Sequence, residues 1–323
     1  MPSTALLGLW SCLILGTSFP DPALRTFQDG FTGRRVVRFS SDGRYLAWNG
    51  GTVKGAPAVY LWDCHKETTL TLGRLETDQT RILALAFDGP RLVAVVTDKL
   101  VVWDIASGKL LHETPMPIMH GRGLPVLSAN GAAVALADAQ GKVQYAFVND
   151  LKNFISLKEK CRSRAVLQLA ADGTRLVVVD AGQVRLYDTV KKELLKTLDV
   201  PDSLRCIALS KDYSYLAYGG VNRFGLIDLT TGKLESYSLS KEPGAGMSVH
   251  AITMSPDRQS LLLGGFKLIR FDIPRKKIVT IRPLAIYGIS HEVQAMDVAQ
   301  DGKLFASGHT GRVQLWDYRE LFK

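Results

Sequence analysis

Hydrophobic and polar positions alternate along this chain in short blocks, each apolar block being four or five residues long and bounded by turn-forming residues. The pattern is clearest in the segments Ala165–Leu169, Arg175–Val179, Val184–Tyr187 and Leu194–Leu198. Between them, Asp172-Gly173 and Ala181-Gly182 supply residues that tolerate positive φ, as tight hairpins require. Short Val- and Leu-rich segments separated by such turns predict an antiparallel meander of four strands.

This four-strand unit recurs along the whole chain. Three apolar segments end in a full Trp-Asp pair: Val59–Asp63, Leu100–Asp104 and Val313–Asp317. Weaker copies lie between them, at Tyr187–Asp188, Ile227–Asp228, Phe271–Asp272 and a degenerate Tyr145. A tight turn such as Asp172-Gly173 precedes each mark by about 15 to 20 residues. Two markers in phase at a period of about 40 residues indicate a repeat architecture, with seven units in this chain.

The repeated unit resembles the WD40 repeat, and the chain is similar to bacterial stand-alone WD40 repeat proteins. The resemblance implies an all-β fold, a seven-bladed β-propeller of four-stranded antiparallel blades, over residues 24–323. Tyr318–Lys323 is too short for a turn and a fourth strand of the last blade. Leu24–Phe27, before the first unit, resembles the fourth strand Leu194–Leu198. We therefore predict that this N-terminal strand completes the seventh blade and removes an open sheet edge.

One family feature is missing from its usual place. Strong WD40 units carry a Gly-His pair before the first strand, where the imidazole takes part in hydrogen bonds with the Trp. In this chain the Gly308-His309 pair falls in a different turn. We therefore expect the blades to cohere mostly by apolar packing.

The first residues differ from the repeats. Ala5–Gly16 is an uncharged apolar run with the length of a signal-peptide core, too short to span a bilayer. We predict that residues 1–18 are a signal peptide, cleaved near Ser18, and that the protein is exported to the periplasm or the extracellular space. The stretch before the run lacks Lys and Arg, so a cytoplasmic protein or a retained membrane anchor are the alternatives. Beyond the leader, Cys64, Cys161 and Cys206 are odd in number, which favours small buried hydrophobes over disulfides.

Motifs for catalysis are missing from the sequence. It has no His-Glu-x-x-His, no Gly-x-Ser-x-Gly, no phosphate-binding loop and no Cys-x-x-Cys, so we predict a protein that is not an enzyme and needs no cofactor. Three histidines, His120, His250 and His291, lie in connections that a propeller would bring to one face. They could meet as metal ligands, but we favour local hydrogen bonds and predict no metal site.

Charge offers a second candidate surface. The formal net charge is +9. Basic residues gather in two classes of turn, after the aromatic–Asp pair and after the Asp-Gly turn: Lys66, Lys109, Lys191, Lys192, Lys233, Arg275, Lys276, Lys277, Arg44, Arg91, Arg175, Arg258 and Lys303. Both classes open on the same side of a propeller. Solubility alone can account for them, and without interleaved aromatics they do not predict nucleic-acid binding.

We predict that the protein is a monomeric, non-catalytic platform that binds a protein partner through its loop faces. Length variation points to the connections Asn49–Pro57, His112–Gly123, Ser240–His250 and Pro283–His291. The candidate partner-binding residues are Met119, His120, His250, Tyr287 and His291 there, and Arg275, Lys276 and Lys277 on the basic face. The alternative is an enzyme, or a propeller that binds a small ligand or a metal at the channel mouth. Two or more His, Asp or Glu side chains meeting there would favour that alternative.

Overall fold

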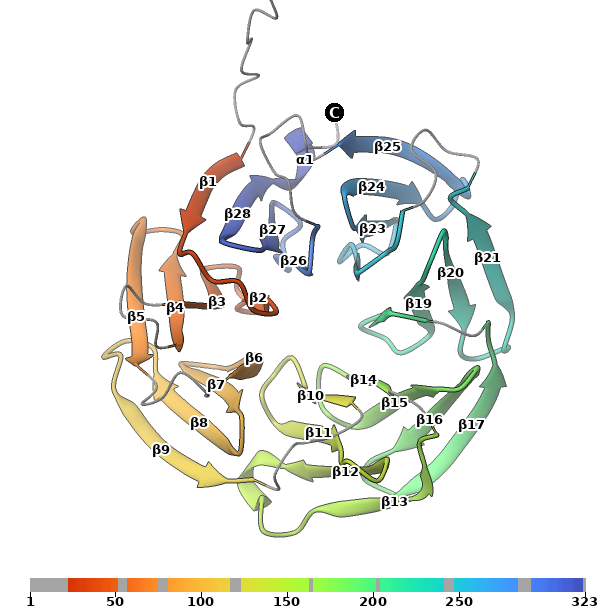
Figure 1. Cartoon of the computed structure of the whole chain (residues 1–323), viewed down its shortest axis with the longest axis horizontal. Helices are drawn as coiled ribbons and strands as arrows, with labels where there is room; N and C mark the ends of the chain where they lie inside the picture. Colours follow the sequence, from red (N-terminus) through yellow and green to blue (C-terminus); the bar gives the residue numbers. More distant parts are fainter. Residues whose placement is uncertain are drawn as a thin grey trace, which may run out of the picture.

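Seven four-stranded antiparallel sheets surround a central axis in the computed structural model, which describes residues 23–51, 57–74, 81–116, 123–162, 165–201, 204–240, 247–283 and 292–321 (Figure 1). The predicted seven-bladed propeller is thereby confirmed. Each sheet forms one blade, with its first strand nearest the axis and its last on the rim. The leader predicted for residues 1–18 lies outside the described ranges. No helix within these ranges is long and apolar enough to cross a membrane.

The four strands of each blade follow one another from the axis outward. Blades 1 to 4 consist of β2 (Val37–Phe39), β3 (Tyr45–Gly51), β4 (Pro57–Asp63) and β5 (Thr68–Arg74); β6 (Ile82–Asp88), β7 (Arg91–Val96), β8 (Lys99–Asp104) and β9 (Leu110–Pro115); β10 (Gly123–Leu127), β11 (Ala133–Ala137), β12 (Lys142–Phe147) and β13 (Ile155–Lys160); and β14 (Val166–Leu169), β15 (Arg175–Asp180), β16 (Gln183–Asp188) and β17 (Glu193–Asp199). Blades 5 to 7 consist of β18 (Cys206–Leu209), β19 (Tyr215–Gly219), β20 (Arg223–Asp228) and β21 (Leu234–Ser238); β22 (Ala251–Met254), β23 (Ser260–Gly264), β24 (Lys267–Asp272) and β25 (Lys277–Pro283); and β26 (Ala295–Val298), β27 (Leu304–His309), β28 (Arg312–Asp317) and β1 (Ala23–Gln28). Two short helices, η1 (Val148–Asp150) and α1 (Tyr318–Leu321), complete the described elements.

The middle strands of the blades are buried on both sides. Every residue of β11 and of β23 is buried, whereas the rim strand β9 is exposed along nearly its whole length. Continuous apolar runs form such strands because blades stack face to face and leave no side of the strand to water. One resulting cluster joins Leu61 and Leu72 of blade 1 to Leu92 and Trp103 of blade 2. Stacking of this kind fixes each blade against its neighbours.

The Asp of the aromatic–Asp pair organises the turn that follows it. Asp63 Oδ1 accepts hydrogen bonds from the backbone N–H groups of His65 (3.0 Å) and Lys66 (3.1 Å). Asp188 Oδ1 does the same for Val190 (3.0 Å) and Lys191 (2.8 Å). A short acidic side chain caps a turn in this way, so this half of the sequence marker has a local structural role.

The predicted closure by the N-terminal strand is confirmed. β1 pairs antiparallel with β28, with Phe27 opposite Val313, and so completes blade 7 (Figure 1). The seam between blades 7 and 1 is therefore joined by strand pairing between the two ends of the described chain.

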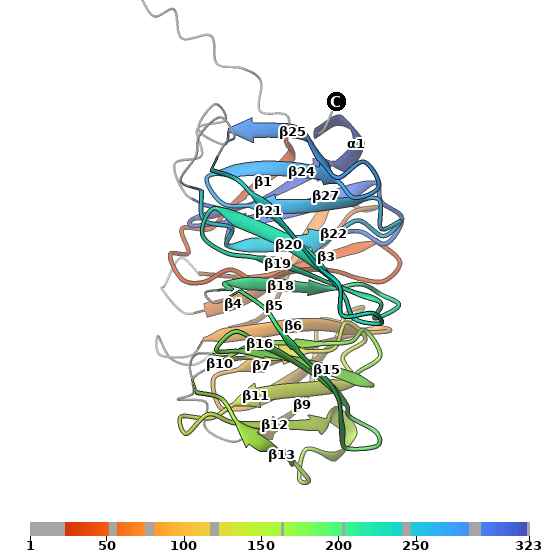
Figure 2. The same cartoon turned by 90° about the vertical axis from the view of Figure 1, so that its right-hand side faces the viewer.

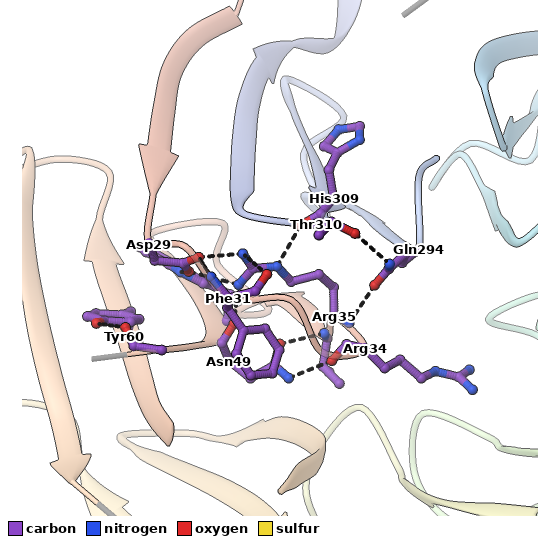
Figure 3. A network of polar contacts seen from close by, with 12 residues as sticks. Asp29, Phe31, Arg34, Arg35, Asn49, Tyr60, Gln294, His309 and Thr310 are labelled. Atoms are coloured by element: carbon purple, nitrogen blue, oxygen red, sulfur yellow. Dashed lines mark hydrogen bonds and ion pairs between the residues drawn. The ribbon is translucent and has the colours of Figure 1, made fainter. Parts of the chain in front are cut away.

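A buried arginine reinforces that seam (Figure 3). The Arg35 side chain is fully buried and forms an ion pair with Asp29, which is 7% exposed. Arg35 Nη1 donates to Asp29 Oδ2 (2.8 Å) and to the carbonyl of Asn49 (2.6 Å), and its Nε donates to the carbonyl of His309 (2.7 Å). We call these four residues the closure clasp. It ties the segment after β1 to strands of blades 1 and 7, and full hydrogen bonding is what makes a buried charge tolerable.

His309, at the end of β27, is linked to Trp316 through Ser307, although the repeat pattern gave the Gly308-His309 pair no role. Trp316 Nε1 donates to Ser307 Oγ (2.9 Å), and that hydroxyl lies 2.8 Å from His309 Nε2, with all three side chains fully buried. The expectation of mostly apolar cohesion is amended here, as it is at the closure clasp. Trp62 and Trp103, the other Trp residues of the marker, pack in apolar clusters.

Candidate functional site

The two faces of the ring are built from different parts of each blade. Because strands alternate in direction, the innermost strand begins on the face where the second and the outermost strands end. We call this the entry face. It lies on the left in Figure 2, toward which β25 runs, whereas α1 lies on the opposite side. That opposite side, the turn face, carries the turns that follow the innermost strand and the aromatic–Asp pair.

A cavity of about 540 Å³ opens where the innermost strands begin. We call it the channel mouth, and six of the seven blades line it. One wall is apolar and comes from blades 3, 4 and 5: Leu124, Val126, Ala165, Val166, Leu167 and Leu204. The other wall is polar and comes from blades 5, 6, 7 and 1: Arg205, His250, Glu292, Gln294, Thr32 and Arg34. The volume is within the range of ligand-binding sites.

A contact between a histidine and a glutamate bridges two blades in the polar wall. His250 Nε2 lies 2.9 Å from Glu292 Oε2, and the two side chains are 25% and 32% exposed. The backbone of His250 is fixed because its N–H donates to the carbonyl of Gly264 (2.8 Å). The mouth thus does bring two titratable side chains together. This is the kind of meeting that favours the alternative of an enzyme or a ligand-binding propeller.

Two arginines add positive charge to the same wall. Arg34 and Arg205 are both exposed, and they enter from blades 1 and 5. Arg34 extends away from the closure clasp, although its neighbour Arg35 is part of it (Figure 3). The backbone of Arg205 is held by the carbonyl of Gly219 (2.8 Å). The polar wall therefore combines two guanidinium groups with one carboxylate, and that carboxylate is shared with His250.

The mouth is anchored directly to the closure clasp. Gln294 Oε1 accepts a hydrogen bond from the backbone N–H of Arg35 (3.1 Å), and its Nε2 donates to Thr310 Oγ1 (3.1 Å) (Figure 3). Gln294 is thereby held in place within the polar wall, and preorganised groups lose less entropy on binding.

The cysteine next to the mouth is not suited to nucleophilic chemistry. Burial raises the pKa of the Cys206 thiol to about 12, although the nearby positive charge of Arg34 opposes this effect. A thiol with so high a pKa remains protonated near neutral pH, and it is the thiolate that reacts. Within the described ranges, no group of three or more His, Cys, Asp and Glu side chains is placed to hold a metal.

The predicted partner-binding residues fall into three groups. Met119, His120, Tyr287 and His291 lie outside the described residues. His250 lies in the channel mouth, as its position before an innermost strand suggested. Arg275, Lys276 and Lys277 lie on the turn face, so the structure separates them from His250.

Much of the charge on the turn face is compensated locally. Arg275 pairs with Asp272 (3.4 Å) and Lys276 with Glu235 (2.7 Å). Lys276, followed by Lys233, lowers the pKa of the Glu235 carboxyl to about 2. Further pairs on this face are Arg44–Asp63, Arg91–Asp88, Arg175–Asp188, Lys233–Glu235, Arg258–Asp212 and Lys303–Asp301. The basic turns counted in the sequence therefore give a weaker positive field than their number indicates.

Sequence reasoning missed most of the mouth and the whole clasp. Arg34, Arg205 and Glu292 were not singled out, although each lies one to three residues before an innermost strand, as His250 does. That placement at the start of a blade was the available signal. Asp29 and Arg35 offered none, because their pair does not recur in the repeats and meets His309 only in the folded ring.

Comparisons with known proteins agree with this architecture. Residues 282–317, which include β26 to β28, match the family described as WD domain, G-beta repeat. Among solved structures, the β-propeller domain of Myceliophteria thermophila Cps50 (Swd1) is similar, with a TM-score of 0.72 and 16% identity over 92% of this chain and 99% of that one. A chain of the Mitotic Checkpoint Complex gives 0.74 and 15% identity, covering 98% of each chain. Comparison with curated proteins gives no match. At such identities the two structures show the fold, a β-propeller, and the family match identifies a WD40-type repeat in the last unit.

Proposed function

We propose that the protein is a non-catalytic, monomeric interaction platform that binds a protein partner at the entry face, centred on the channel mouth. One observation carries the proposal: the mouth gathers an apolar wall and a charged wall from six blades onto a rigid ring. Rigid scaffolds with a concave, mixed surface are typical binding sites. A chain of similar fold belongs to a multiprotein assembly, the Mitotic Checkpoint Complex, which supports the same class of role.

Quantitative affinity capture tests the proposal. The immobilised protein should retain a defined partner from a lysate of its source cells, and the double variant Arg205→Ser/Leu124→Ser at the mouth should lose it. The matched control is Arg319→Ser/Lys109→Ser, which removes two exposed cations from the turn face. Equal capture by the mouth variant, or loss only with the control, would contradict the assignment. Thermal unfolding must show both variants folded.

A small-ligand function is the second candidate, and the His250–Glu292 pair beside a cavity of about 540 Å³ is the observation that favours it. Binding of a metabolite or a metal ion with a Kd below the micromolar range, measured by calorimetry and abolished by Glu292→Gln, would support this function. Turnover of a substrate would overturn the non-catalytic proposal.

We further propose that residues 1–18 direct export. The uncharged run Ala5–Gly16 supports this because its length matches a signal-peptide core. Mature protein should begin near Phe19, and replacing Leu13 and Ile14 with Asp should keep the protein in the cytoplasm. An intact Met1 on cytoplasmic protein would refute the proposal.

A further inference from the structure

We propose that the channel mouth recognises a short peptide segment in which an acidic side chain stands next to an apolar one. This inference rests on the proposed function and specifies the chemistry of the partner. It follows from the division of the mouth into two walls of different character, which line one cavity.

The apolar wall offers a contact for aliphatic side chains. Leu124, Val126, Val166 and Leu204 are only partly buried, although they line a concave surface. Burying them under a ligand removes apolar area from water, which is favourable in proportion to the area covered. A wholly polar ligand would not gain the free energy of burying this wall.

The polar wall selects negative charge. Arg34 and Arg205 bring two guanidinium groups, and the only carboxylate of the wall, Glu292, lies 2.9 Å from His250. No ion pair within the described ranges involves Arg205. A guanidinium presents its donors in a planar fork that matches a carboxylate. An incoming Asp or Glu side chain can therefore gain a charge-assisted contact here, whereas a Lys or Arg would meet like charge.

The position of Arg34 strengthens this assignment. The Arg34 side chain extends away from the closure clasp (Figure 3). Gln294 links the clasp to the mouth, so the backbone that carries Arg34 is held in place. A cation on a fixed backbone orients a ligand better than one on a mobile loop.

A peptide fits the lining better than a fatty acid. The polar wall spans blades 5, 6, 7 and 1 and adds the hydroxyl of Thr32 to the charged groups. Backbone amides of a peptide can use such hydrogen-bonding groups along their whole length, whereas an alkyl chain would leave them without partners at a cost in free energy.

Selection from a displayed library of random heptapeptides tests the inference. On the wild-type protein, selected sequences should be enriched in Asp or Glu directly beside Leu, Ile, Val or Phe. Arg205→Ser should lose the acidic preference, Leu124→Ser the apolar preference, and the turn-face control Arg319→Ser neither. Selected sequences without the acidic–apolar pair, or equal enrichment on all variants, would overturn the proposal.

Binding of one selected peptide, measured by fluorescence polarisation, sharpens the test. Replacing its acidic residue by the amide should weaken binding about tenfold, and Arg205→Ser should do the same. The two changes together should weaken binding little further, because they remove one contact. Fully additive losses would overturn the contact.

A lipid carboxylate would give a different pair of results. Decanoate would then displace the bound peptide completely, and the library selection would show no enrichment of acidic residues. If the mouth variant loses the captured protein but the library shows no acidic–apolar pair, this inference is refuted. The proposed interaction platform would then still hold.

Discussion

The entry face and the turn face of the ring contrast in how they use charge. The turn face has many Lys and Arg side chains, but pairs such as Arg44–Asp63 and Lys276–Glu235 neutralise a large share of them locally. On the entry face, Arg34 and Arg205 instead flank a concave surface with an apolar wall. The number of basic residues on a face therefore does not predict where an acidic partner binds. The distance from each cation to its nearest acidic side chain decides whether that cation is available to a partner.

The largest effect should come from the buried charge pair of the entry face. Asp29→Ala leaves Arg35 buried without its counter-ion, and breaking such a pair costs about 3–5 kcal/mol of unfolding free energy. Asp88→Ala on the turn face removes the partner of Arg91, but both side chains are well exposed, so the loss should stay below about 1 kcal/mol. Urea unfolding measures both. Similar losses for the two variants would erase the contrast between the faces.

A smaller loss should follow from the hydrogen-bonded chain at Trp316. Ser307→Ala removes the acceptor of the buried indole N–H and should cost about 1–3 kcal/mol. Ser156→Ala, at an exposed rim position, should stay within about 0.5 kcal/mol. If Ser307→Ala is as stable as wild type, the polar chain contributes nothing to blade 7.

Acid titration should reveal the pairing on the turn face. Glu235 has a folded-state pKa of about 2, below its ordinary value of 4.5. A lowered pKa stabilises the fold above the unfolded value, and that contribution is lost as the pH falls from 4.5 toward 2. Wild-type stability should therefore fall more steeply over this window than that of Glu235→Gln. Parallel curves from chemical denaturation would show that the pairs with Lys276 and Lys233 are not formed.

The smallest effect concerns a turn-face backbone. Lys192 has φ of 62°, in the left-handed region that favours glycine, and Gly108 and Gly232 occupy the equivalent place in other blades. Lys192→Gly should be neutral or stabilise by up to about 1 kcal/mol, because relief of strain competes with the flexibility gained by the unfolded chain. Lys191→Gly, one residue earlier, has no such strain to relieve and should destabilise. Calorimetric melting temperatures distinguish the pair.

The sequence predicted those features that repeat. The strands around Ala181-Gly182 follow the expected pattern, and both turn residues have positive φ. Closure by Leu24–Phe27 was predictable because that segment resembles an outer strand. The closure clasp was not, since Asp29 and Arg35 occur once and meet His309 only in the folded ring. A repeated motif can be recognised in the sequence alone, whereas a contact at the seam depends on how the two ends of the chain meet in the fold.

The mouth was predictable in position but not in composition. The long connections indicated the entry face, and His250 was identified there, yet Arg205 and Glu292 become informative only when six blades converge. Loop length drew attention to Met119 and Tyr287, which lie outside the described residues. The few residues before each innermost strand are a better guide, because the charged residues of the mouth lie there.

Pairing of β1 with β28 also determines when blade 7 can fold during synthesis. Thr26 and Gln314, which meet across these strands, are separated by 288 positions in the chain. At about 5–20 residues per second, the strand made first waits roughly 15 to 60 s before its partner leaves the ribosome. During that interval six blades can stack in order while the ring remains an open arc. Pairing of β1 with β28 is then the last step of folding. Any factor that keeps β1 unpaired until that step affects closure of the whole ring.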